Sequence, residues 1–230
     1  MKKINISPRL LSAADFVRQD AILADIGTDH AYLPLFLLAE GRIRRAVCSD
    51  INEGPLATAR ANVAAAGFSD RVEFTLADGA DALMGRGVTD FAICGMGGEL
   101  IADIIGRSSL FFDGSVRLIL QPMTRRGELV KFLYSKGFRI DFESYSVDSG
   151  KTYVTLAVSY VGTPAEVSDI VAEIGSCATP CKNKEAKALY LRDRLAAYKK
   201  RAEGVAKSKN GGEDFTAYVE YTEKMLNDLN

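Results

Sequence analysis

The sequence D-I-G-T-D-H-A-Y-L-P, from Asp25 to Pro34, lies between two apolar runs and decides how the chain is expected to fold. An apolar strand that enters a glycine-containing turn and then a helix is typical of nucleotide-binding folds. Phosphate-binding turns carry further glycines, because their exposed backbone N–H groups bind the pyrophosphate. Here Asp29 and Ala31 stand where those glycines are expected. The sequence therefore predicts a nucleoside-binding turn that suits a cationic ligand and argues against NAD.

Short apolar runs alternate with helical patterns on both sides of this turn. The runs are bounded by Gly, Asp or Pro, as parallel strands covered on both faces should be. This alternation predicts a doubly wound parallel sheet, with a further helix over residues 7–18 before it. The expected strands are residues 21–26, 46–50, 72–77, 90–94 and 116–121, and the expected helices are residues 33–39, 54–66, 98–105 and 125–136.

Two more strand-like runs, residues 138–147 and 152–161, are separated only by D-S-G-K. This spacing predicts a hairpin with Ser149 and Gly150 in its turn. Five parallel strands followed by an antiparallel pair form the seven-stranded sheet of class I methyltransferases, whereas a dinucleotide-binding dehydrogenase would normally add another parallel crossover. The expected fold class is therefore α/β and Rossmann-like, which does not by itself fix the function.

The pattern changes again in the last quarter of the chain. Apolar residues recur at spacings of 4, 3, 4 and 3 over residues 191–205 and again over residues 215–229, where Thr222 is a polar interruption. The breaker S-K-N-G-G-E-D separates the two stretches. Together they predict two antiparallel helices packed as a short coiled-coil hairpin. We expect a catalytic domain over residues 1–162 and a helical arm over residues 163–230.

Charge is distributed unevenly over this arm. Residues 182–209 hold ten Lys or Arg against three acids, and residues 211–230 hold one Lys against five acids. The basic stretch can bind phosphates, or it can form ion pairs with the acidic second helix. The whole chain of 230 residues has a formal net charge of −1, which predicts no general attraction to nucleic acid.

Composition bounds the remaining possibilities. A hydrophobic content of 47% predicts a globular core. Four cysteines are too few for a disulfide scaffold, and Cys177 and Cys181 have no second pair to complete a zinc site. We expect no metal. No run is long enough for a signal peptide or a membrane span, so a cytoplasmic location is expected.

Acidic and glycine residues lie at or directly after the carboxyl ends of four of the expected parallel strands, at the edge where open parallel sheets bind ligands. Asp50 comes 25 residues after Asp25, a spacing that suits a carboxylate accepting from ribose hydroxyls. Asp78 can accept from an adenine amino group. Each residue alone can also be a helix cap or a turn former. The candidate cofactor-binding residues are Asp25, Gly27, Asp50, Ile51, Asp78, Gly79, Gly95, Met96 and Gly97.

Three motifs carry a resemblance to a known family: D-I-G-T-D-H-A-Y-L-P, the turn C-G-M-G-G and the run L-I-L-Q-P. On these the chain resembles, over nearly its whole length, the bacterial tRNA (adenine-N1)-methyltransferase family that modifies adenine 22. The family usually has Asn after Gln-Pro, whereas this chain has Met123. A D/N-P-P-Y motif is absent after the fourth strand, which is compatible with a ring nitrogen as the target.

The resemblance implies methyl transfer from S-adenosylmethionine to N1 of an adenine in tRNA. Separately, we expect a monomer or weak homodimer. Asp29 is expected to accept from the adenine amino group and to stabilise the cationic product. His30 is expected to orient Asp29 or to contact the base. The substrate-binding candidates are Tyr32, which can stack on the base, and Gln121, Pro122, Arg9, Lys199, Lys200 and Arg201.

Two other functions remain open at this point. One is a small-molecule methyltransferase in which the helical arm is a lid or a dimer contact. The other is a non-catalytic nucleoside-binding module that docks a protein partner through the hairpin. Methyl incorporation into tRNA, into small metabolites or into neither distinguishes the three.

Overall fold

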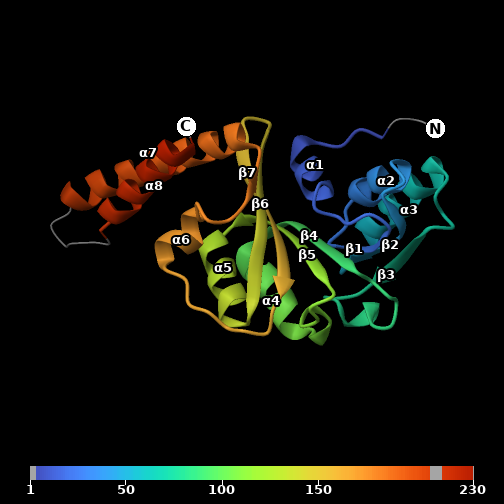
Figure 1. Ribbon diagram of the computed structural model, residues 1–230. Helices are drawn as coiled ribbons and strands as arrows, with labels where there is room; N and C mark the ends of the chain where they lie inside the picture. Colours follow the sequence, from blue (N-terminus) through green and yellow to red (C-terminus); the bar gives the residue numbers. More distant parts are fainter. Residues whose placement is uncertain (1–3, 208–213, 230) are drawn as a thin grey trace.

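The structure, a computed structural model, describes residues 4–207 and 214–229, without the side chains of residues 205–207. Its centre is an eight-stranded sheet in the order β3-β2-β1-β4-β5-β7-β6-β8 (Figure 1). Strands β1 to β5 are parallel, and β7 is antiparallel to both β5 and β6. The expected α/β methyltransferase-like fold is confirmed.

The strands lie close to where the sequence predicts them, and β1 has the expected bounds. They are β1 (Ala21–Ile26), β2 (Ile43–Asp50), β3 (Val72–Leu76), β4 (Asp90–Gly97), β5 (Arg117–Thr124), β6 (Phe138–Asp148), β7 (Lys151–Tyr160) and β8 (Cys181–Lys182). Strand β8 was not expected. It has two residues, too few for any periodicity, and it is defined only by its parallel pairing with Glu143 and Ser144 of β6.

Helices cover both faces of the sheet because the strand side chains alternate between two apolar clusters. Leu23 and Ile119 belong to the cluster under the first three helices, whereas Ala24, Leu118 and Leu120 belong to the cluster on the other face. The helices are α1 (Pro8–Ala14), α2 (Tyr32–Ala39), α3 (Glu53–Ala66), α4 (Gly98–Arg107), α5 (Arg126–Ser135), α6 (Asp169–Ile174), α7 (Lys184–Lys207) and α8 (Thr216–Leu229).

Helix α1 is shorter than the expected 7–18. Ser7 caps it, its side chain accepting from the Leu10 N–H. The helix ends at Ala14 because Arg18 is bound elsewhere: its backbone N–H and its Nε donate to the two carboxylate oxygens of Asp90, at 2.9 and 2.8 Å. These two bonds hold the chain at the start of β4 and leave the intervening residues in a turn.

The predicted helical arm consists of α7 and α8, which lie side by side and extend from the sheet in Figure 1. Thr222, expected as a polar interruption, is fully buried, and its hydroxyl donates to the Tyr218 carbonyl at 2.6 Å. All of the breaker except Asp214, and the Val205 side chain, lie outside the described residues. Tyr198 and Met225 belong to the same apolar cluster as one face of the sheet. The boundary at residue 162 stays a prediction, and the apolar core extends across it.

A buried ionic cluster joins α7 to the sheet. Glu143 of β6 accepts from Arg126 at 2.6 Å and from the Tyr145 hydroxyl at 2.7 Å, and Lys187 of α7 lies 3.7 Å from it. Burial alone lowers the pKa of Arg126, but the charge of Glu143 raises it overall. Burial and the Glu143 charge likewise raise the pKa of Tyr145, which keeps its hydroxyl a donor. One buried acid is therefore shared by two buried cations.

Candidate functional site

A hollow of about 730 Å³ opens at the carboxyl ends of β1 and β4. These strands are neighbours in the sheet although β2 and β3 come between them in the chain, so the hollow lies where the strand order reverses. Open α/β sheets bind ligands at this position. Its walls are the β1–α2 turn, Cys94 and Gly95 in the last part of β4, Asp148 at the end of β6, and, at the N-terminal side, Asn5, Ile6, Ser7, Arg9 and Leu10. We call it the catalytic pocket.

Asp25 lies at the inner end of this pocket. Its side chain is 9% exposed, and it accepts from the Thr28 hydroxyl at 2.6 Å. Burial raises the pKa of Asp25 to about 6, with a smaller contribution from the charge of Asp50 and an opposing one from Thr28. A carboxylate so poorly solvated gains from a cationic ligand that replaces its lost water.

The two glycine turns of the pocket are in contact with each other. Gly27 has φ of 75°, and a Cβ placed on it would lie 2.0 Å from the terminal methyl carbon of Met96. Its N–H donates to the Ser49 carbonyl at 2.8 Å. Only glycine fits here without displacing Met96, because φ is positive and the space is filled. Met96 therefore supports the turn from the β4 side.

The three residues predicted to act on the base are brought together on the rim of the pocket. His30 Nε2 lies 3.1 Å from an Asp29 carboxylate oxygen, and the His30 ring stacks on Tyr32 with 5.0 Å between centroids. Ala31 between them is left-handed at φ 56°, which places the two rings side by side. The Asp29 side chain is 72% exposed. A solvated carboxylate is thus presented next to an aromatic pair.

Arg9 and Gln121, which we expected as substrate contacts, form one unit. Gln121 is fully buried, and its amide oxygen accepts from Arg9 Nη1 at 2.7 Å. Its amide nitrogen donates to the Thr155 hydroxyl at 2.7 Å and to the Arg9 carbonyl at 3.0 Å. Arg9 lines the catalytic pocket, whereas Gln121 does not. Gln121 is therefore placed to orient Arg9, a role that the sequence did not indicate because the two are 112 residues apart.

The remaining cofactor candidates lie along the same edge but outside the pocket walls. Asp50 accepts from the Asn52 N–H at 2.8 Å, and Ile51 is 63% exposed. Asp78, followed by Gly79, forms two bonds with the Arg107 guanidinium at 3.0 and 3.1 Å. These bonds lower the pKa of Asp78. The cofactor roles of this group stay predictions, and Asp78 would have to share its carboxylate with Arg107.

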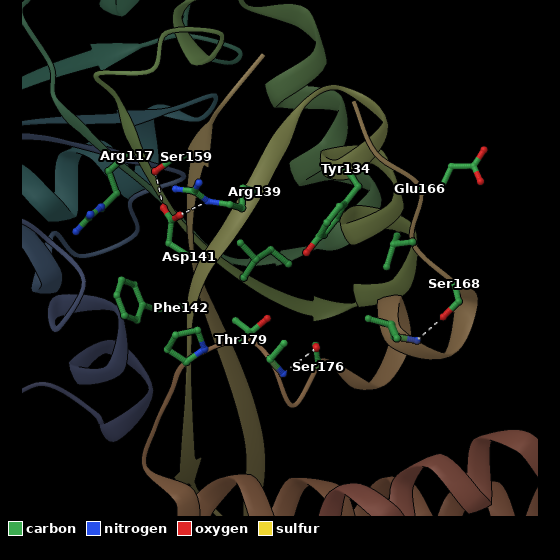
Figure 2. Close-up of a pocket in the computed structure, with 15 residues that line it drawn as sticks. Arg117, Tyr134, Arg139, Asp141, Phe142, Ser159, Glu166, Ser168, Ser176 and Thr179 are labelled. Atoms are coloured by element: carbon green, nitrogen blue, oxygen red, sulfur yellow. Dashed lines mark hydrogen bonds and ion pairs between the residues drawn. The ribbon is translucent and has the colours of Figure 1, made fainter. Parts of the chain in front are cut away.

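A larger hollow of about 870 Å³, shown in Figure 2, lies at the opposite end of β5 and is not the candidate site. Asp141 in it accepts from Arg139 at 2.8 Å and from the Ser159 hydroxyl at 2.5 Å. Its charged groups are thus partly paired with one another, and it is remote from the carboxyl ends of the strands. None of the residues predicted to bind the cofactor or the substrate lines this hollow.

The predicted phosphate contacts on α7 do not share one environment. Lys199 forms an ion pair with Glu223 of α8 at 2.8 Å, which is the alternative that the charge pattern left open. Arg201 lies over the Phe215 ring at 5.5 Å from its centroid. Lys200 is exposed and has no ion pair among the described residues.

Two negative observations apply to the residues that the structure describes. None of their helices combines the length and apolar character that crossing a membrane requires. Within the same part of the chain, no three His, Cys, Asp or Glu side chains are grouped as metal ligands.

Comparison with known proteins gives consistent matches. The sequence profile of the family described as "Methyltransferase domain" matches residues 6–156. A Bacillus subtilis protein named tRNA (adenine(22)-N(1))-methyltransferase is 29% identical over 192 residues, which cover 84% of this chain and 81% of that protein. A crystal structure of a Streptococcus pneumoniae "putative tRNA (m1A22) methyltransferase" is 31% identical, with a TM-score of 0.83 over 96% of this chain and 100% of that one. A structure of the same protein in complex with S-adenosyl-L-methionine has 32% identity, a TM-score of 0.80 and the same coverage.

Proposed function

The chain belongs to the methyltransferase-domain family that includes the tRNA (adenine(22)-N1)-methyltransferases, and we propose that it methylates N1 of an adenine in tRNA, with adenine 22 as the expected position. The observation that carries this proposal is the catalytic pocket at the switch point of the sheet, where a buried carboxylate and a guanidinium line one cavity. A tRNA substrate also supports a cytoplasmic location. Monomer or weak homodimer stays a prediction.

The pocket fits the charges of S-adenosylmethionine, which has a sulfonium, an ammonium and a carboxylate and lacks phosphate. When bound, this cofactor supplies a methyl group on a positively charged sulfur. Asp25 is our candidate for its cationic side, and Arg9 for its carboxylate, since a guanidinium binds carboxylates in two-point geometry. Gly27 and Gly95 both have positive φ, a backbone conformation that glycine adopts without strain and that shapes the two turns against which the ligand would bind.

Asp29, His30 and Tyr32 are our candidates for handling the base. Adenine N1 has an in-plane lone pair, so it needs no general base, but positive charge develops on the ring as N1 is methylated. Asp29 accepts a hydrogen bond from the exocyclic amino group and stabilises that charge. His30 holds the Asp29 carboxylate, and the Tyr32 ring offers a stacking surface that offsets part of the cost of unstacking the base.

The proposed activity is tested by incubating the protein with S-adenosylmethionine and an unmodified tRNA transcript and identifying the methylated nucleoside by mass spectrometry. We expect N1-methyladenosine, and its loss when adenine 22 of the transcript is replaced by guanine. Methylation of small-metabolite extract but not of tRNA would favour the small-molecule enzyme instead. Cofactor binding without transfer to either would favour a non-catalytic module.

Arg9→Ala is expected to weaken cofactor binding by about 10- to 100-fold, because a charged hydrogen bond is worth about 1.5–3 kcal/mol. Isothermal titration calorimetry with S-adenosylhomocysteine gives the Kd. Arg60→Ala is the matched control. Arg9 lies over the Tyr153 ring, and Arg60 likewise lies over an aromatic ring, Phe74, but on α3 outside the pocket. An unchanged Kd in Arg9→Ala, with the same melting temperature as wild type, would show that Arg9 does not bind the cofactor and would leave it as a candidate contact to the RNA.

Cofactor affinity is expected to fall as the pH is lowered through the pKa of Asp25, which is raised to about 6. A cationic ligand binds the ionised carboxylate, so affinity falls by about tenfold per pH unit below that value and is constant above it. In the absence of cofactor, the free energy of unfolding is expected to decrease as the pH rises from about 4 to 6. Over this range the folded state keeps the proton on Asp25, whereas the unfolded state has already lost it. Asp25→Asn is expected to bind weakly at every pH and to lose both dependences. A steep fall at pH 6 that persists in Asp25→Asn would assign it to another group.

A further inference from the structure

Two adjoining hollows run from beside the catalytic pocket to the helical arm. The first, about 350 Å³, includes Pro122, Lys151 and Tyr153 in its wall, and the second, about 740 Å³, includes Arg201 and Phe215. Both are lined by Met123, Thr124, Arg125, Glu173 and Arg194, so they form one groove, which we call the arm groove. It begins at the catalytic pocket, because the Arg9 guanidinium of that pocket lies 6.0 Å from the Tyr153 ring centroid.

Three cations in the arm groove are not neutralised by an acid. Lys151, Arg194 and Arg201 have no ion pair within 4.0 Å among the described residues, although Glu173 also lines both hollows. The Nε of Arg194 is buried and has no hydrogen-bond partner among the described atoms. By contrast, the other three cations that line the groove, Arg125, Lys131 and Arg126, are paired with Glu128, Asp169 and Glu143 respectively.

The two arginines of this set are held in place by aromatic rings. Arg194 lies 5.6 Å from the Tyr190 ring centroid and Arg201 lies 5.5 Å from that of Phe215. A guanidinium on a ring keeps its N–H edges free and has lost part of its rotamer freedom before a ligand arrives. Such an edge suits bidentate binding of phosphate. Positions 194 and 201 are seven residues apart on α7, so they lie on one face of that helix. Positions 199 and 200 lie on other faces.

Aromatic and apolar side chains lie between these cations. Tyr198, Phe215 and Tyr218 line the arm end of the groove, and Met123, 44% exposed, lies where its two parts meet. A ligand that combines regularly spaced negative charge with flat apolar rings satisfies both kinds of wall, and RNA has both. A peptide of acidic residues alone would leave the aromatic surface without a matching group.

We propose that the arm groove binds the sugar–phosphate backbone of the tRNA whose adenine enters the catalytic pocket, with Arg194 and Arg201 as phosphate contacts and Lys151 next to the pocket. The inference rests on the proposed function and deepens it by assigning the RNA path. It also separates the three residues of α7 that were expected to contact phosphates. Arg201 belongs to the RNA path, whereas Lys199 is paired with Glu223 and Lys200 lies on another face of the helix.

The test compares the double variant Arg194→Ala/Arg201→Ala with wild type in tRNA binding over a series of salt concentrations. Affinity is expected to fall at least tenfold, and the slope of log K against log salt to become shallower by about 2, one phosphate contact for each arginine. The KM for tRNA should rise while the Kd for S-adenosylhomocysteine stays the same. Arg194→Lys/Arg201→Lys, which keeps both charges, should retain most of the salt slope and controls for a folding defect in the alanine variant.

Two control variants sharpen the result. Arg60→Ala removes an arginine of the same kind over Phe74, remote from the groove, and Lys199→Ala/Lys200→Ala removes two charges from α7 outside it. Both should bind tRNA as wild type does. The inference is overturned if the arginine double variant keeps its affinity and slope, or if the lysine double variant loses as much. If wild type methylates no tRNA at all, the proposed function fails, whereas normal methylation with an unchanged KM in the arginine variant rejects only the groove.

Discussion

Asp29→Ala is expected to lower kcat by about 100-fold, the effect of removing one group that stabilises charge in a transition state. The Kd for S-adenosylhomocysteine should remain close to that of wild type, because Asp25 and Arg9 keep their positions deeper in the pocket. Single-turnover methylation of a tRNA transcript, at saturating cofactor and RNA, measures the chemical step without contributions from product release.

The expectation depends on where Asp29 is held. Its carboxylate is 72% exposed and touches His30, which is in turn fixed against Tyr32, so it faces the mouth of the pocket. Asp29→Asn keeps an acceptor but loses the charge, and we expect an intermediate rate. His30→Ala should cost less, about tenfold, since it removes only the group that positions the carboxylate. Normal transfer by Asp29→Ala with normal cofactor affinity would remove Asp29 from the mechanism.

Asp25 and Asp29 show how far a sequence motif can specify a site. Both carboxylates were predicted from one ten-residue stretch, since each stands close to the end of β1. Their difference was not predictable from residue type: Asp25 is buried with its pKa raised to about 6, whereas Asp29 is solvated on the rim. Burial depends on what the rest of the chain packs over each residue, and this information is not local.

The same distinction between local and non-local information applies to the fold. Strand β1 and the β6–β7 hairpin were predictable because apolar runs and a Ser149-Gly150 turn are local signals. Strand β8 and the early end of α1 were not, because each is set by a partner distant in sequence, Glu143 and Asp90 respectively. The same is true of the bond between Gln121 and Arg9, which joins two residues that the sequence named separately as candidate substrate contacts.

Glu143→Ala is expected to destabilise the protein by about 3–5 kcal/mol, because breaking a buried ion pair from one side leaves charge without compensation. Glu143 is 1% exposed and is the acid shared by Arg126 and Lys187, so its loss leaves two buried cations near each other. The Tyr145 hydroxyl loses its acceptor at the same time. The midpoint of urea unfolding measures the change, with the m-value checked for two-state behaviour.

The control is Glu128→Ala, which breaks an ion pair of similar length with Arg125, the residue before Arg126. That pair, at 3.0 Å, is exposed, so its loss should cost only about 0.2–1 kcal/mol. Removing all three charges together, as Glu143→Leu with Arg126→Met and Lys187→Met, should recover most of the loss, because the penalty comes from the unpaired cations rather than from the absent pair. If Glu143→Ala were no worse than Glu128→Ala, water would have to reach the cluster, and α7 would not be fixed to the sheet by these charges.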